Sequence, residues 1–109
     1  MHRISWLAPS FALALMAVSA IAAEGDGDVA TGKELAETKC AVCHNFDSAE
    51  KKIGPGLKGI KDGKLPSGKE ATYKNVLDNL NQGGGGMPAF ENLLTAEEKD
   101  HITAYVLTL

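Results

Sequence analysis

The chain has 109 residues, of which 14 are acidic and 11 are Lys or Arg, so its formal charge is −3 and 44% of its residues are hydrophobic. This length holds one small domain, which excludes a two-domain enzyme or a doubly wound nucleotide-binding fold, and the acidic balance argues against binding nucleic acid. The two cysteines, Cys40 and Cys43, are too few for a disulfide-rich scaffold or a four-cysteine zinc domain.

The first segment, residues 1–23, is predicted to be a cleaved secretory signal peptide. It starts with basic residues, contains no acidic residue and has an apolar centre. Small residues before the acidic stretch predict cleavage after Ala22 or Ala23. An uncleaved membrane anchor is the alternative, but proline and serines leave the apolar run short of the about 20 residues that span a bilayer. The domain at residues 24–109 is therefore expected in the periplasm, without stable membrane insertion.

Three helices are predicted in the mature chain, and no alternating pattern indicates a sheet, so the expected fold class is all-α. The first helix starts after Asp28, a good N-cap residue, and runs to the cysteines. The second has an expected capping box at residues 67–70 and ends at Gly83, and the third has one at residues 95–98. The last two helices carry apolar stripes that predict core-facing sides, at Tyr73, Val76, Leu77 and Leu80, and at Ile102, Tyr105, Val106 and Leu109.

The stretch Cys40-Ala-Val-Cys43-His44 follows the first helix. On a helix, residues three and four apart share one face, so two thiols and an imidazole would converge. This spacing is typical of c-type haem attachment, in which both sulfurs form thioethers and the imidazole binds iron.

Three other roles for this stretch fit the sequence less well. A thioredoxin-like site needs alternating strands and helices, which the sequence does not indicate. A zinc site needs four ligands, and the mature chain adds only His101 to the three residues of the motif. A structural disulfide would leave His44 without a role.

A second iron ligand is predicted at Met87, the only methionine outside the signal peptide. Four glycines precede it and Pro88 follows, which allows the backbone to approach a flat cofactor closely and keeps Met87 out of a helix. His101 is the other candidate for this position, but its place beside Ile102 on the third helix predicts a surface residue.

Residues 50–75 contain seven lysines and three acidic residues, whereas each flank is acidic. This segment is either a solvated loop or a positive docking surface for a partner. The glycines from Gly54 to Gly59 match the spacing of a dinucleotide-binding loop, but no apolar strand precedes them.

Taken together, these motifs resemble the class I c-type cytochromes, and in particular the small bacterial monohaem carriers similar to cytochromes c-551, c-553 and c6. The resemblance covers most of the mature chain, through Gly32, residues 40–44, residues 53–57, Met87-Pro-Ala-Phe90 and residues 102–105.

The resemblance implies a small cytochrome c fold, with helices packed around one covalently attached haem c. It implies that the Pro55 carbonyl accepts a hydrogen bond from His44, that Leu57 packs on the haem, and that Tyr105 packs near Gly32. The family commonly has an aromatic residue at the position of Ala36, so a looser helix contact, or another side chain filling the gap, is expected there.

The function that these features favour is a soluble periplasmic electron carrier with His44 and Met87 as iron ligands, and not an enzyme. It would dock transiently with a redox protein as donor and another as acceptor, and act as a monomer. Two alternatives stay open. One is a haem subunit of a larger periplasmic oxidoreductase, and the other is a haem sensor or weak peroxidase in which Met87 dissociates.

Overall fold

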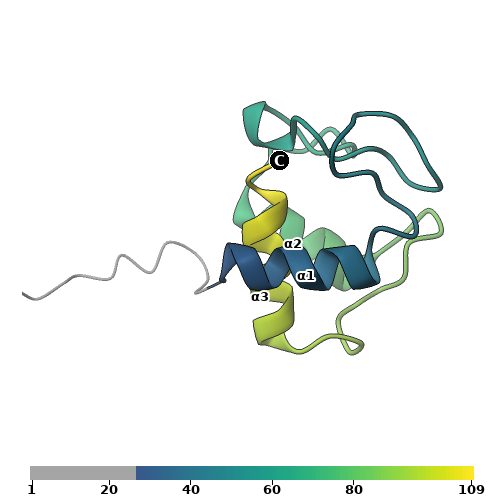
Figure 1. Cartoon of the computed structure of the whole chain (residues 1–109). Coiled ribbons are helices and arrows are strands. Elements are labelled where there is room, and N and C mark those ends of the chain that lie inside the picture. Colours follow the sequence, from purple (N-terminus) through teal and green to yellow (C-terminus); the bar gives the residue numbers. More distant parts are fainter. Residues whose placement is uncertain (1–26) are drawn as a thin grey trace, which may run out of the picture.

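A computed structural model describes residues 27–109, so the predicted signal peptide at residues 1–23 lies outside the described residues. The elements in chain order are α1 (Val29–Lys39), the short 3-10 helix η1 (Ile60–Asp62), α2 (Tyr73–Gln82) and α3 (Ala96–Val106), as Figure 1 shows. Between residues 27 and 109, extended pairing is limited to two isolated bridges. The predicted all-α class is confirmed. No helix in this part of the chain is long and apolar enough to cross a membrane.

Two of the three predicted helix starts are correct. Asp28 caps α1, because its side chain accepts a hydrogen bond from the Thr31 backbone N–H at 2.9 Å. Thr95 and Glu98 form the predicted capping box of α3, in which each side chain accepts from the other residue's backbone N–H. These reciprocal bonds satisfy donors that the first turn of a helix leaves free.

The predicted capping box at residues 67–70 is wrong. Helix α2 begins at Tyr73, and Thr72 is its N-cap. Residues 65–69 instead form a tight turn, in which Gly68 has a positive φ of 87° and the Leu65 N–H donates to the Lys69 carbonyl at 2.8 Å. Burial of Leu65 in the core holds this turn away from helical geometry.

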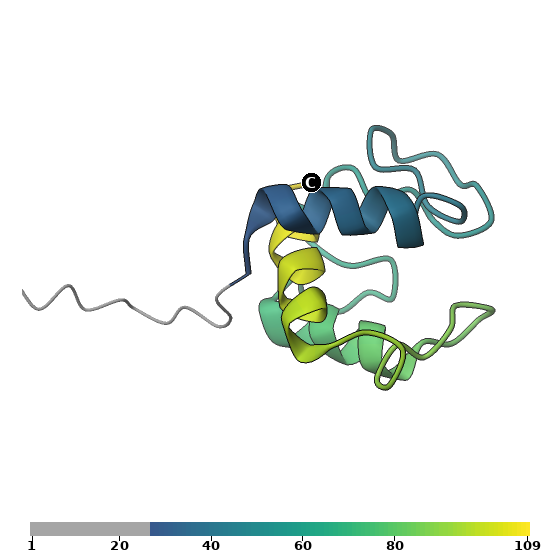
Figure 2. The same cartoon turned by 60° about the horizontal axis from the view of Figure 1, so that its bottom comes forward.

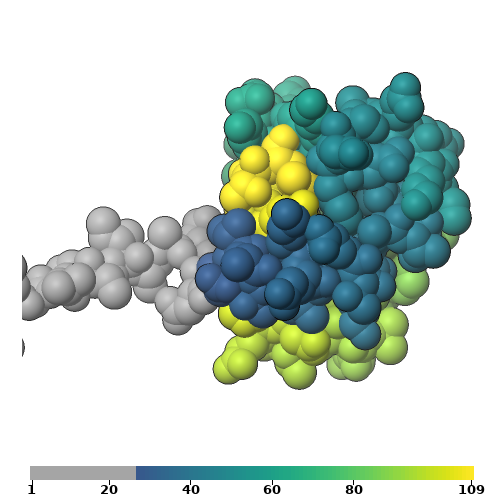
Figure 3. Space-filling view, in the orientation of Figure 1, coloured from purple at the N-terminus to yellow at the C-terminus, as the bar shows by residue number. Residues whose placement is uncertain are grey.

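Helices α1 and α3 cross in direct contact. Their ribbons lie across one another in Figures 1 and 2, and in the space-filling view α1 covers the middle of α3 (Figure 3). Gly32 makes this crossing possible, because a Cβ there would collide with the backbone of His101 and lie 2.9 Å from the Cβ of Tyr105. The expected contact between Tyr105 and Gly32 is therefore present.

The expected loosening at Ala36 does not occur, since this residue is fully buried on α1. Phe46 supplies an aromatic contact to the terminal helix. Its ring meets Tyr105 edge to face, with ring centroids 5.7 Å apart.

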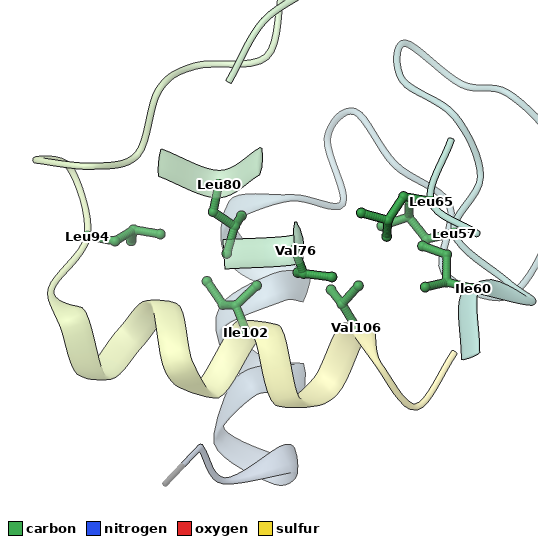
Figure 4. Packing of buried hydrophobic residues seen from close by; sticks show 8 residues of the cluster. All are labelled: Leu57, Ile60, Leu65, Val76, Leu80, Leu94, Ile102 and Val106. Atoms are coloured by element: carbon green, nitrogen blue, oxygen red, sulfur yellow. The ribbon is translucent and has the colours of Figure 1, made fainter. Parts of the chain in front are cut away.

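The hydrophobic core joins α2 and α3 to the segment that contains η1. Val76 and Leu80 of α2 face Ile102 and Val106 of α3 (Figure 4). The same cluster continues through Leu57, Ile60, Leu65 and Leu94. The predicted apolar stripes are confirmed in part. Val76 and Leu80 of α2, and Ile102 and Val106 of α3, belong to the core, whereas Tyr73 and Leu77 are only half-buried and lie outside this cluster.

Candidate functional site

The first helix runs up to the cysteines, as predicted, so the two cysteines and His44 come directly after the last residue of α1. Cys40 is the C-cap of α1, and residues 40–43 continue as turns. The backbone N–H groups of Cys43 and His44 both donate to the Cys40 carbonyl, at 3.0 and 2.9 Å. This tight turn preserves the convergence that the spacing predicts, so both thiols and the imidazole line the same cavity.

Both thiols are free and half-buried. Burial, and next the neighbouring Cys43, raises the pKa of the Cys40 thiol, so this group is held in its neutral form. In residues 27–109 no cluster of three or more His, Cys, Asp and Glu side chains could hold a metal ion. The side chains around the motif therefore do not provide the four ligands that a structural zinc site requires.

His44 is oriented by the loop at residues 53–57. Its Nδ1 lies 2.7 Å from the Pro55 carbonyl oxygen. Because a carbonyl can only accept, Nδ1 carries the hydrogen and donates, and Nε2 keeps a lone pair for a metal ion. The loop is fixed by the Gly54 N–H, which donates to the Cys43 carbonyl at 2.6 Å.

Gly54 also permits the imidazole to sit against the loop, since a Cβ there would lie 2.7 Å from the ring. The glycines from Gly54 to Gly59 thus serve close packing beside His44 and a turn at Gly59, where φ is 94°. Only the short helix η1 follows them. The dinucleotide-loop geometry of a strand, a turn and a long helix is absent from this part of residues 27–109.

The cavity has a volume of about 330 Å³. Its lining includes the motif and residues 84–88 of the glycine-rich loop, residues 83–88, which follows α2. Its remaining lining is largely apolar and includes Leu57, Ile60, Leu65, Val76, Leu80, Phe90, Ile102 and Val106. A cavity with this lining, two thiols and an imidazole fits a flat, apolar macrocycle that is attached through sulfur and bound at its metal.

Met87 lies at the end of the glycine-rich loop and also lines the cavity. Gly83, Gly84, Gly85 and Gly86 all have positive φ, at 60°, 120°, 62° and 95°. Such a run is accessible to glycine at little cost, which explains the composition of the loop. The loop closes on itself through the Met87 N–H and the Gly84 carbonyl at 3.0 Å.

The sequence did not single out Asn79, which contacts the Met87 sulfur. Its Nδ2 donates to Sδ across 3.6 Å, and Asn79 also lines the cavity although it is exposed to solvent. The sequence gives only a weak signal for this contact. Asn79 is a polar residue between the core residues Val76 and Leu80, and a polar residue in such a place is usually only in contact with solvent.

His101 lies away from the cavity. It is half-buried at the crossing of α1 and α3, where its Nδ1 accepts a hydrogen bond from the Asp28 backbone N–H at 2.8 Å. The structure thus brings all six predicted cofactor-contacting residues to the lining of one cavity: Cys40, Cys43, His44, Pro55, Leu57 and Met87. The Pro55 carbonyl also contacts His44. The cavity lining leaves out His101, the alternative ligand.

Comparisons with known proteins agree with this geometry. Residues 27–106 match the family described as cytochrome C oxidase, cbb3-type, subunit III. The chain is 33% identical over 81 residues to a cytochrome c6 from Rippkaea orientalis, which covers 74% of this chain and 70% of that protein. It is 27% identical over 89 residues to cytochrome c-554(547) from Halothiobacillus neapolitanus, covering 76% and 98% of the two chains.

A solved structure of cytochrome c6 from the diatom Phaeodactylum tricornutum has the same fold. Its TM-score is 0.61 at 31% sequence identity, and the match covers 75% of this chain and 93% of that one. The chain therefore belongs to the cytochrome c family, as a class I monohaem c-type cytochrome whose cofactor is one covalently bound haem c.

Proposed function

We propose that this electron carrier is a periplasmic monomer in which His44 and Met87 are the two axial ligands of the haem iron. The observation that carries this proposal is the shared cavity. It holds the imidazole and the only thioether of residues 27–109, and the hydrogen bond from His44 to Pro55 leaves Nε2 available. Cys40 and Cys43 would supply the two thioether attachments.

When bound, haem c supplies a one-electron couple between Fe(III) and Fe(II), and no substrate bond is formed or broken. The Pro55 carbonyl fixes the ring of His44 and increases the basicity of its Nε2. The thioether of Met87 is a soft ligand that favours Fe(II) and raises the reduction potential. Leu57 would pack against the ring plane, and the apolar lining keeps water away from both ligands.

The edge of the cavity offers a surface for transient docking. Two apolar side chains that line it, Val42 and Ile53, are 64% and 69% exposed. The segment at residues 50–75 also contributes Ile53 to this edge, and its lysines at Lys51, Lys58, Lys61, Lys64 and Lys69 are exposed. A small apolar contact, with exposed lysines on the segment that carries Ile53, suits partners that must leave quickly, with interfaces below about 1,200 Å².

Incorporation of the cofactor tests the attachment residues. Expressed in a host that matures c-type cytochromes, the protein should keep its colour after acid–acetone extraction and should have the mass of the mature chain plus one haem. Replacing Cys40 or Cys43 with Ala should reduce the yield of holoprotein, and His44→Ala should leave almost none. The matched control is His101→Ala, which should mature normally. Normal maturation of the His44 variant would refute its role as ligand.

The location is tested by fractionation. The holoprotein should be released with the periplasm, with an N-terminus at Ala23 or Glu24. Retention of residues 1–23 in a membrane fraction would instead indicate an anchor.

A second candidate function is a subunit of a larger oxidoreductase, which the description of the matching family favours. A subunit would be purified in a stable complex, whereas a free carrier would elute as a monomer in size-exclusion chromatography. The sensor alternative requires Met87 to dissociate. Carbon monoxide binding to the reduced protein at neutral pH would support it, because a six-coordinate carrier leaves no free iron site.

A further inference from the structure

Lys99, on α3, is the only charged side chain that is buried in residues 27–109, with 9% of its surface exposed. Its Nζ donates two hydrogen bonds, to Asn81 Oδ1 at 2.7 Å and to the Glu91 carbonyl at 3.2 Å. Both acceptors are neutral. The single ion pair found in the described residues is elsewhere, between Lys74 and Asp78.

Burying an ammonium group lowers the stability of a protein unless the group is hydrogen-bonded. Taking a charge out of water is unfavourable unless hydrogen bonds replace its hydration, and an apolar side chain of the same length often gives equal or greater stability. Lys99 lies on the core-facing side of α3, where a Met side chain of similar length would pack as well as Lys does. Packing therefore does not explain why this residue is a lysine, and the explanation lies in the two segments that its hydrogen bonds connect.

The two acceptors stand on either side of the loop that carries Met87. Asn81 lies in the last turn of α2, before the loop, and Glu91 follows it. The loop has few intrinsic restraints, because its four glycines lack a Cβ and have a wide range of accessible backbone conformations. Lys99 thus ties both ends of a flexible loop to a third element, α3. The backbone adds a second tie, from the Phe90 N–H to the Leu80 carbonyl at 2.7 Å.

We infer that Lys99 is a positioning residue that holds the Met87 loop closed over the iron site by anchoring Asn81 and Glu91 to α3. This inference rests on the proposed function, in which Met87 binds iron. Lys99 is not itself among the residues that line the cavity. It lowers the population of an open loop, in which Met87 has left the metal.

Competition by imidazole measures that open population. An added ligand can bind iron only when Met87 has left, so its apparent dissociation constant is its intrinsic constant divided by the open fraction. The experiment titrates imidazole into oxidised holoprotein and follows the weak far-red absorption band of methionine-bound Fe(III). Lys99→Met removes both hydrogen bonds but keeps the apolar stem. We expect imidazole to bind it about tenfold more tightly, equivalent to about 1.4 kcal/mol of easier loop opening.

Asn81→Leu is the second variant. It removes one of the two hydrogen bonds without altering α3, so it should also bind imidazole more tightly than the wild type. The matched control is Lys74→Met, which also removes a lysine but on the exposed side of α2, and it should bind imidazole like the wild type. Guanidine unfolding of each holoprotein separates positioning from general stability. Lys99→Met should unfold at the same or a higher denaturant concentration while its loop opens more easily.

Three results would overturn the inference. The first is wild-type imidazole affinity in both Lys99→Met and Asn81→Leu, and the second is an equal gain of affinity in Lys74→Met. The third is a gain of imidazole affinity in Lys99→Met that is matched, in free energy, by an equal loss of global stability. Failure of the proposed function looks different, because the wild type itself would then lack the far-red band and Met87→Ala would leave its spectrum unchanged.

Discussion

The crossing of α1 and α3 can be tested with Gly32→Ala. Gly32 lies inside α1, so helix propensity alone favours alanine by about 0.5–1 kcal/mol. The structure predicts the opposite sign, because the new Cβ would collide with the His101 backbone, which cannot rotate away as a side chain can. Overpacking costs about 1–3 kcal/mol. The net expectation is a loss of about 1–2 kcal/mol, with Tm falling by about 4–8 °C for each kcal/mol in a domain of this size.

The assay is thermal and guanidine unfolding of the oxidised holoprotein, followed by circular dichroism. Lys33→Ala is the matched control, since Lys33 is exposed on α1 next to Gly32, and its stability should stay within about 0.5 kcal/mol of the wild type. A Gly32→Ala protein as stable as the wild type, or more stable, would refute the close approach of the two helices.

Three further predictions concern the ligand, the pH dependence of stability and the cofactor-free chain. Met87→Ala should lose the far-red band and lower the reduction potential by about 0.1 V or more, a fraction of the about 0.8 V that axial ligands span, whereas His101→Ala should change neither in spectroscopic redox titration. Hydrogen bonds within the helix caps, with Thr31 and Thr95 respectively, lower the pKa values of Asp28 and Glu98. Because these folded-state pKa values lie below the unfolded ones, the stabilisation is complete above the ordinary carboxyl pKa and is lost as pH falls from there through the lowered folded-state values. Guanidine unfolding at a series of acidic pH values should therefore show a shallower decline for Asp28→Asn, and an unchanged slope would contradict this assignment. Finally, the apoprotein should show no cooperative thermal transition by circular dichroism, because a chain of this size buries little apolar surface without its cofactor; a sharp melt would show that the haem contributes less to the core than we expect.

The sequence by itself determined the features that depend on neighbouring residues. The caps at Asp28 and Thr95 were predictable because their partners lie three residues away in the chain. The turn of Cys40 to His44 was predictable as a convergent set for the same reason. Local chemistry of this kind has few competing solutions, and residue spacing therefore identifies it.

Tertiary structure decided the rest, because the partners come from distant segments. The capping box expected at residues 67–70 has suitable residues, but burial of Leu65 and the positive φ of Gly68 draw this segment into a turn. The burial of Lys99 depends on segments that are distant from it in the sequence. Its ammonium group loses water on burial, and two oxygen atoms replace that hydration: Asn81 Oδ1 from α2 and the Glu91 carbonyl from the segment after the Met87 loop.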